Sequence, residues 1–180
     1  MWRHEPFWRG NSDPKHHEHD ADTTGTVSFG EFGSALVGVF RTASKTDFHW
    51  SGTGALGDGT VQVFDYRVAR ANSILNVGVN TTTFVGYHGQ VFIDSATRGV
   101  RRITIVADDI PKSSRLHATS VSVDYDYVAI NNHDYLLPVA AQIEVSYDRR
   151  ETDLNRIEFR NFHRFGSTTR ILPDYQETKP

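Results

Sequence analysis

The sequence predicts a mainly β fold with one helix, in which a single curved antiparallel sheet, an incomplete half-barrel, wraps around an amphipathic helix. Between His117 and Tyr147, apolar residues recur at every second position on both sides of a polar turn, which is the period of a half-buried hairpin. One apolar stripe at helical spacing precedes the predicted strands. One apolar sheet face and one apolar helix stripe can bury each other, so no second sheet is required.

The hairpin between His117 and Tyr147 has an apolar face made of odd-numbered residues. This inward set comprises Val121, Val123, Tyr125, Tyr127, Leu137, Val139, Ile143 and Val145. Residues that lie opposite each other share a face, so this parity predicts a loop of three or five residues around Asn132 and excludes a loop of two. Pro138 cannot donate to a ladder, so it predicts a sheet edge or a bulge, and a bulge would shift the parity by one.

The predicted helix begins near Ser28, which forms a capping box with Glu31. Its apolar stripe consists of Phe29, Phe32, Leu36, Val39 and Phe40. Three glycines, at positions 30, 33 and 38, each cost up to about 1 kcal/mol of helix propensity relative to alanine. We therefore expect packing on the sheet, rather than intrinsic propensity, to hold this helix.

The whole chain is expected to divide into three zones. Residues 1–26 form an irregular, His-rich N-terminal arm, residues 27–172 the helix and half-barrel domain, and residues 173–180 a C-terminal tail. The predicted strands span residues 46–50, 60–68, 73–79, 82–87, 90–94, 100–107, 117–131, 135–147 and 154–165, with a short one at 168–172. The glycine-rich stretch 52–59 is expected to be a loop.

Composition excludes several function classes. At 180 residues the chain is one domain that can bury a core without a metal or disulfide, and it has no cysteine for either a disulfide or a thiolate site. A net charge of −3 with interspersed signs gives no footprint for nucleic acid. No stretch is apolar enough to span a membrane, and the N-terminus lacks the residue order of a signal peptide.

Two local strings imitate ligand-binding motifs. The string from Gly52 to Gly57 matches G-x-G-x-x-G, but a strand pattern follows where a dinucleotide fingerprint requires a helix, so we interpret it as a hairpin loop and predict no cofactor. His16, His17 and His19 carry imidazoles suitable for a metal, but their spacing lacks a second ligand pair. They indicate a weakly metal-attracting tail rather than a metal site.

Paired carboxylates are the main indication of an enzyme. Glycoside hydrolysis uses two carboxylates about 5 to 10 Å apart. Asp124 and Asp126 are two apart on one strand, but they lie on the face opposite the apolar one, and Asp108 with Asp109 more plausibly ends a strand. At the hairpin tip, His133 and Asp134 are adjacent residues of a turn and lack an accompanying nucleophile. A hydrolase that uses one of the carboxylate pairs is kept as an alternative.

The strings FGEFGSAL, VFDYRV, GYHGQVFID, VRRITIVADDIP, VDYDYVAI, YLLPV and NRIEFRNFHRF, between residues 29 and 165, resemble a family of uncharacterised exported bacterial proteins. That family is in turn similar to the LolA/LolB-like lipoprotein-carrier superfamily. The resemblance implies a periplasmic or exported protein with a wet convex side and an apolar concave side that binds acyl chains. The superfamily has no short catalytic motif, so it assigns a role to no single residue, and its usual N-terminal helix is replaced here by the His-rich arm.

The leading hypothesis is a non-enzymatic binding module that carries a lipid, acyl chain or other apolar ligand on its concave face. The candidate ligand-binding residues are Phe32, Leu36, Phe40, Val121, Val123, Tyr125, Tyr127, Val139, Ile143, Val145, Ile157 and Phe159. A filled core is the other interpretation of the same residues. A third hypothesis is a protein-interaction module that pairs through exposed strand edges. The sequence specifies neither the ligand nor the oligomeric state.

Overall fold

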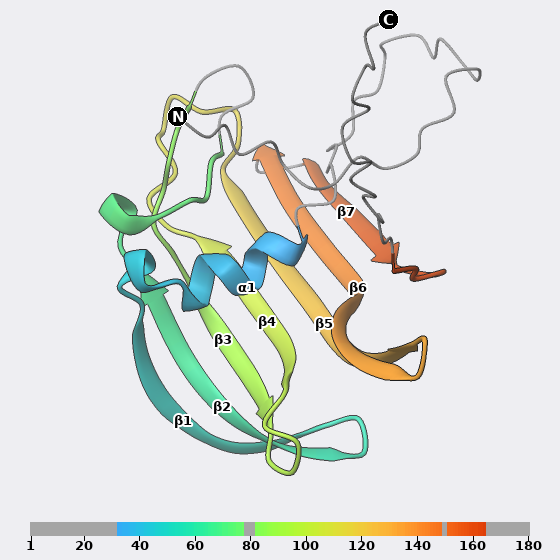
Figure 1. Cartoon of the computed structure of the whole chain (residues 1–180). Helices are drawn as coiled ribbons and strands as arrows, with labels where there is room; N and C mark the ends of the chain where they lie inside the picture. Colours follow the sequence, from blue (N-terminus) through green and yellow to red (C-terminus); the bar gives the residue numbers. More distant parts are fainter. Residues whose placement is uncertain (1–31, 78–81, 149–150, 165–180) are drawn as a thin grey trace, which may run out of the picture.

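The computed structural model describes residues 32–77, 82–148 and 151–164. In this part of the chain, helix α1 (Phe32–Phe40) precedes one seven-stranded antiparallel sheet in which every strand pairs with its sequence neighbours. The strands are β1 (Asp47–Leu56), β2 (Gly59–Val68), β3 (Tyr87–Asp94), β4 (Val100–Ala107), β5 (Ala118–Ile130), β6 (His133–Asp148) and β7 (Glu151–Glu158). The sheet is curved and not closed into a barrel, and α1 lies across its concave face (Figure 1). The predicted fold class is confirmed.

Several predicted element boundaries are wrong. Strand β1 continues through the glycine-rich stretch to Leu56, so the expected loop shrinks to a turn of Gly57 and Asp58. The strands predicted at 73–79 and 82–87 do not form within the described residues 73–77 and 82–86, which contain one isolated bridge between Asn76 and Phe84, and Tyr87 begins β3. A short 3-10 turn, η2 (Arg70–Asn72), precedes this segment. The capping box, the arm 1–26, the strand at 168–172 and the tail 173–180 lie outside the described residues.

The β5–β6 hairpin closes with a two-residue turn, so the prediction of an odd-length loop is wrong. Ile130 pairs with His133, and the two residues between them, Asn131 and Asn132, have φ of 52° and 62°. Such left-handed conformations are what a tight hairpin turn requires, and asparagine tolerates them. The parity argument failed because a bulge leaves Val139 unpaired between the Asp124 and Tyr125 pairings, next to Pro138, where the sequence predicted an edge or a bulge.

The bulge also corrects the predicted inward face beyond Asp124. Leu137 pairs with Asp126 and therefore shares the outward face, whereas Leu136 packs against the core. Tyr127 has the inward parity but is 43% exposed near the hairpin end. The odd-numbered rule thus holds along β5 and fails on β6 between the bulge and the turn, at Leu137.

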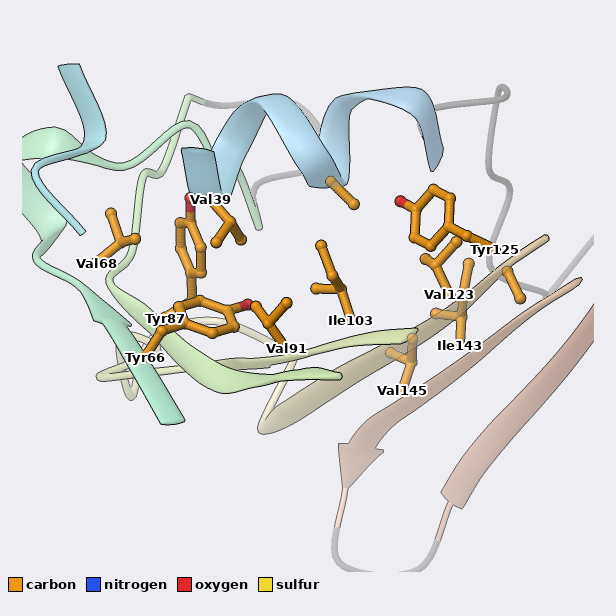
Figure 2. Packing of buried hydrophobic residues seen from close by; sticks show 12 residues of the cluster. Val39, Tyr66, Val68, Tyr87, Val91, Ile103, Val123, Tyr125, Ile143 and Val145 are labelled. Atoms are coloured by element: carbon orange, nitrogen blue, oxygen red, sulfur yellow. The ribbon is translucent and has the colours of Figure 1, made fainter. Parts of the chain in front are cut away.

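The core lies between α1 and the concave face of the sheet. Ala35 and Val39 project from the helix onto side chains of β2 to β6, as Figure 2 shows for Val39. The sheet contributes Tyr66, Val68, Tyr87, Val91, Ile103, Val123, Tyr125, Ala141, Ile143 and Val145 to this cluster. These residues form one continuous cluster that spans the middle five strands, and Val61 and Val85 are buried outside it.

Tyrosine hydroxyls tie this core to the backbone. Tyr87 donates a hydrogen bond of 2.8 Å to the carbonyl of Gly38 in α1, and this hydroxyl would lie 3.1 Å from a Cβ atom at position 38. A larger residue at position 38 would crowd that bond, which accounts for a glycine that weakens the helix. The helix is therefore held by tertiary contacts, as the sequence predicted.

Burial shifts the ionisation of three tyrosines. It raises the pKa of Tyr125 to about 12, and it also raises the pKa of Tyr66 and Tyr87 above the ordinary value for tyrosine. In Tyr66, the other two phenols add to the effect of burial. All three rings therefore stay neutral in the folded protein at pH values where an unfolded chain would begin to lose their protons.

We expect the protein to lose stability above pH 10, because the unfolded tyrosines ionise there while the buried ones do not. For Tyr125 the loss begins near pH 10 and ends near its folded pKa of about 12. One such tyrosine changes the free energy of unfolding by about 1 kcal/mol per pH unit. Urea denaturation between pH 8 and 11.5 measures this slope.

Tyr125→Phe should make the slope shallower, since it removes one titrating group and keeps the ring. Tyr127→Phe is the matched control, because Tyr127 is 43% exposed on the same strand. Equal slopes in wild type and Tyr125→Phe would contradict the expectation.

Candidate functional site

The predicted ligand-binding residues mostly converge on the concave face, where they form part of the core. Val123, Tyr125, Ile143 and Val145 are buried, and Leu36, Val121, Ile157 and Phe159 are partly buried and pack against the same cluster. Val139 is partly buried at the β6 bulge, while Phe40 and Tyr127 are 48% and 43% exposed. Phe32 belongs to α1, but its side chain lies outside the described part of the structure.

A row of aromatic rings extends the core toward the β1 edge of the sheet. Phe40 stacks on Phe48 with ring centroids 5.7 Å apart, Phe48 lies 6.2 Å from Tyr66, and Tyr66 meets Tyr87 edge-on at 6.2 Å. Exposure rises along the row, from 2% at Tyr87 and 3% at Tyr66 to 39% at Phe48 and 48% at Phe40.

Trp50 continues this surface along β1. It is 65% exposed, and its indole nitrogen donates a hydrogen bond of 3.1 Å to Gln62 Oε1 on β2. Trp50 and Phe48 are two residues apart on one strand and so project to the same face. We call Phe40, Phe48 and Trp50 the aromatic rim.

The carboxylate pair of β5 points outward and is bound by arginines. Asp124 forms an ion pair with both Arg102 Nε and Nη2, and Asp126 lies 3.2 Å from Arg101. Arg101 is an extra residue of β4 against β3, and this bulge lets two consecutive arginines face the same pair of carboxylates. The outward position expected for Asp124 and Asp126 is confirmed.

An open groove of about 570 Å³ crosses the outer face over β1 to β4. Its lining residues are Asp47, His49, Asp65, Tyr66, Arg67, His88, Gly89, Gln90, Thr104 and Val106. The register of the four strands brings these residues together in two rows. In the first row, each residue pairs with the next one across β1 to β4: Asp47, Arg67, His88 and Val106. The second row lies beside it and consists of His49, Asp65 and Gln90. Every member of these two rows has the parity opposite to that of the core residues.

Polar side chains in this groove are held by their neighbours. The amide nitrogen of Gln90 donates to Asp65 Oδ1 at 2.8 Å, and His49 Nε2 lies 3.3 Å from Asp47 Oδ2. His88 Nδ1 lies 2.6 Å from Oδ1 of Asp108.

Asp108 follows β4 and supports the groove from outside its lining. Its side chain is 13% exposed. Its Oδ2 atom lies 3.1 Å from Nη2 of Arg67 and forms an ion pair with it, but the geometry of this contact is not that of a hydrogen bond. The sequence paired Asp108 with Asp109 as carboxylates, whereas the structure pairs Asp108 with a histidine and an arginine.

The groove floor depends on the absence of a side chain at Gly89. In the β3–β4 ladder, neither Gly89 nor Gln90 has a paired partner, and a Cβ atom at position 89 would lie 1.9 Å from the carbonyl oxygen of Thr104. That carbonyl accepts a hydrogen bond of 2.8 Å from Tyr66, while the hydroxyl of Thr104 accepts one of 2.9 Å from the Gln90 backbone. Side-chain bonds thus replace ladder bonds at this point.

Within the described residues, the strings that imitate ligand-binding or catalytic motifs lack the structural context that those motifs require. The glycine string from Gly52 to Gly57 lies in β1 and the turn that follows, with strand β2 rather than a helix after it. His133 and Asp134 begin β6 and are both exposed. His16, His17 and His19 lie outside the described residues, and among the residues that are described no group of three or more His, Cys, Asp or Glu could hold a metal ion. Nor does this part contain a helix long and apolar enough to cross a membrane.

Sequence reasoning named Phe40 but missed Phe48 and Trp50 of the aromatic rim, and it missed the outer groove. The signal for the rim was present, since Phe48 and Trp50 alternate with polar residues. Prediction of the groove would have required the register of β1 on β2. The sequence did not reveal this register, because residues 52–59 were interpreted as a loop.

Comparison with protein-family models, with curated proteins and with solved structures found no match for the chain. The resemblance to the LolA/LolB-like superfamily is therefore still a prediction, and the candidate site is argued from geometry alone.

Gly89→Ala should destabilise the protein by about 2 kcal/mol or more, because its methyl group would collide with backbone rather than with a movable side chain. Gly54→Ala on β1 is the matched control, since its nearest atom would be 3.7 Å away at Val63. Urea denaturation of both variants measures the difference. Equal stability of the two variants would show that β3 and β4 are not in close contact at Gly89.

Proposed function

We propose that this protein is a non-enzymatic binding module that carries an apolar ligand, such as a lipid or acyl chain, on its concave face. The observation that carries the proposal is that the aromatic row leaves the core and ends in the exposed aromatic rim. Single exposed apolar residues are ordinary, but adjacent exposed aromatic rings that continue a core favour a binding surface.

The coverage of the concave face supports the same proposal. Within the described residues, the nine-residue α1 is the one α-helix, and it lies over a sheet of seven strands (Figure 1). Partly buried apolar residues flank the cluster toward β7, among them Ile157 and Phe159. An apolar ligand at either side of α1 would bury surface that the helix leaves exposed.

The rim also indicates the strength of the interaction. About two fifths of Phe48 is exposed, at 39%. Covering that part, roughly 80 Å² at about 25 cal/mol per Å², gives about 2 kcal/mol. Loss of this one ring should therefore weaken binding by at least about ten-fold.

The test is a titration of the purified protein with dodecanol and with palmitate. Binding is monitored by the fluorescence of Trp50 and by native mass spectrometry. We expect a saturable blue shift, because the ligand removes water from an indole that is 65% exposed. Trp2 and Trp8 are replaced by phenylalanine so that Trp50 is the reporter.

Phe48→Ala should weaken this binding by at least about ten-fold. Leu154→Ala is the matched control, because Leu154 is 45% exposed but has the outward parity on β7. The proposal is wrong if neither ligand binds, or if Leu154→Ala weakens binding as much as Phe48→Ala.

A further inference from the structure

The outer groove has a charge pattern that differs from that of the whole chain. Asp47, Asp65 and the supporting Asp108 contribute three carboxylates, against the single guanidinium of Arg67. With neutral histidines this leaves two negative charges around one groove, whereas the whole 180-residue chain carries −3. A concave surface with a net negative charge concentrates cations.

Arg67, the cationic side chain that lines this groove, already forms an ion pair. Arg67 is drawn toward Asp108, 3.1 Å away, and Asp108 lies outside the lining. Among the described residues, the two lining carboxylates, Asp47 and Asp65, form no ion pair with a lysine or arginine and are bonded instead to His49 and Gln90. The negative charge that faces the groove therefore comes from these two aspartates.

Several side chains that line the groove present hydrogen-bond acceptors beside the guanidinium of Arg67. When His88 donates from Nδ1 to Asp108, Nε2 of the neutral ring is an acceptor. Gln90 donates its amide nitrogen to Asp65, which leaves its amide oxygen as a further acceptor. A ligand that fits must therefore supply N–H donors and positive charge together.

We propose that this groove binds a small organic cation that presents ammonium or guanidinium N–H groups. The volume of about 570 Å³ is within the range of small-molecule sites. The described residues include no set of three metal ligands, which favours an organic cation over a metal ion. This site lies on the opposite face of the sheet from the aromatic rim and does not depend on the proposed binding of apolar ligands.

The test is a titration of the ¹⁵N-labelled full chain with agmatine, which carries one guanidinium and one ammonium group. Binding is monitored through the chemical shifts of the backbone amides. We expect saturable shifts at His88, Gln90 and Thr104. Tetramethylammonium, which has charge but no N–H donor, should give no saturable shift at the same ionic strength. If it binds equally well, the groove attracts charge without recognising donors and the proposal is wrong.

Asp65→Asn should raise the dissociation constant for agmatine at least about five-fold, because it removes one of the two carboxylate charges that line the groove. Asp47→Asn should act in the same direction and guards against a fold defect in the first variant. Asp134→Asn is the matched control, since it removes the same charge from an exposed position on the β5–β6 hairpin. An equal loss in this control would overturn the assignment.

The source of the cation is decided by a second titration, with the peptide acetyl-Gly-Arg-Gly-amide. Weaker binding of the peptide than of agmatine supports a small molecule. Tighter binding of the peptide would place the cation on a protein partner and overturn the proposal of a small-molecule site.

Discussion

A single sheet cannot bury its own apolar face, and this constraint governs the described structure. The concave face presents apolar side chains from five consecutive strands, and the nine residues of α1 must cover them. A helix of this length and glycine content is not stable alone, so helix and sheet depend on each other. The bond between Tyr87 and the carbonyl of Gly38 fixes this dependence at one point, because it joins the last turn of the helix to β3.

The same constraint separates the two faces chemically. Rings and aliphatic chains collect under α1, while carboxylates, arginines and histidines occupy the other side of the same strands. Tyr66 links the two, because its ring belongs to the core and its hydroxyl reaches the Thr104 carbonyl beside the groove floor. A change at this tyrosine would therefore affect both candidate surfaces together.

Much of the fold could be predicted from the alternation in β5 and β6 and from the helical stripe ending at Phe40. These patterns report which side of an element is apolar, and that is sufficient for one sheet and one helix. They do not report ladder irregularities. Extra residues such as Ser51, Arg101 and Val139 change register after a strand has begun. Gly52 and Pro138 stand next to two of these positions, but nothing in the local pattern marks Arg101.

The candidate surfaces show the same division. Most of the concave residues were found because they share one period, but the period did not indicate that Tyr127 would be 43% exposed, because alternation does not report where α1 stops covering the sheet. The outer groove assembles from four strands, so its residues approach each other only through three successive registers. Single-strand periodicity contains no information about such neighbours.

In the β5–β6 hairpin, the bulge and the turn follow from one choice of register. Because Val139 stands outside the ladder, Tyr125 pairs with Pro138 and the strands continue to a turn of two residues, Asn131 and Asn132. If Val139 paired within the ladder instead, Ile130 would lie opposite Asp134 and the loop would have three residues. A hairpin that lacked Val139 would keep the two-residue turn with a regular ladder, so the length of β6 and the length of the turn are two expressions of the same constraint.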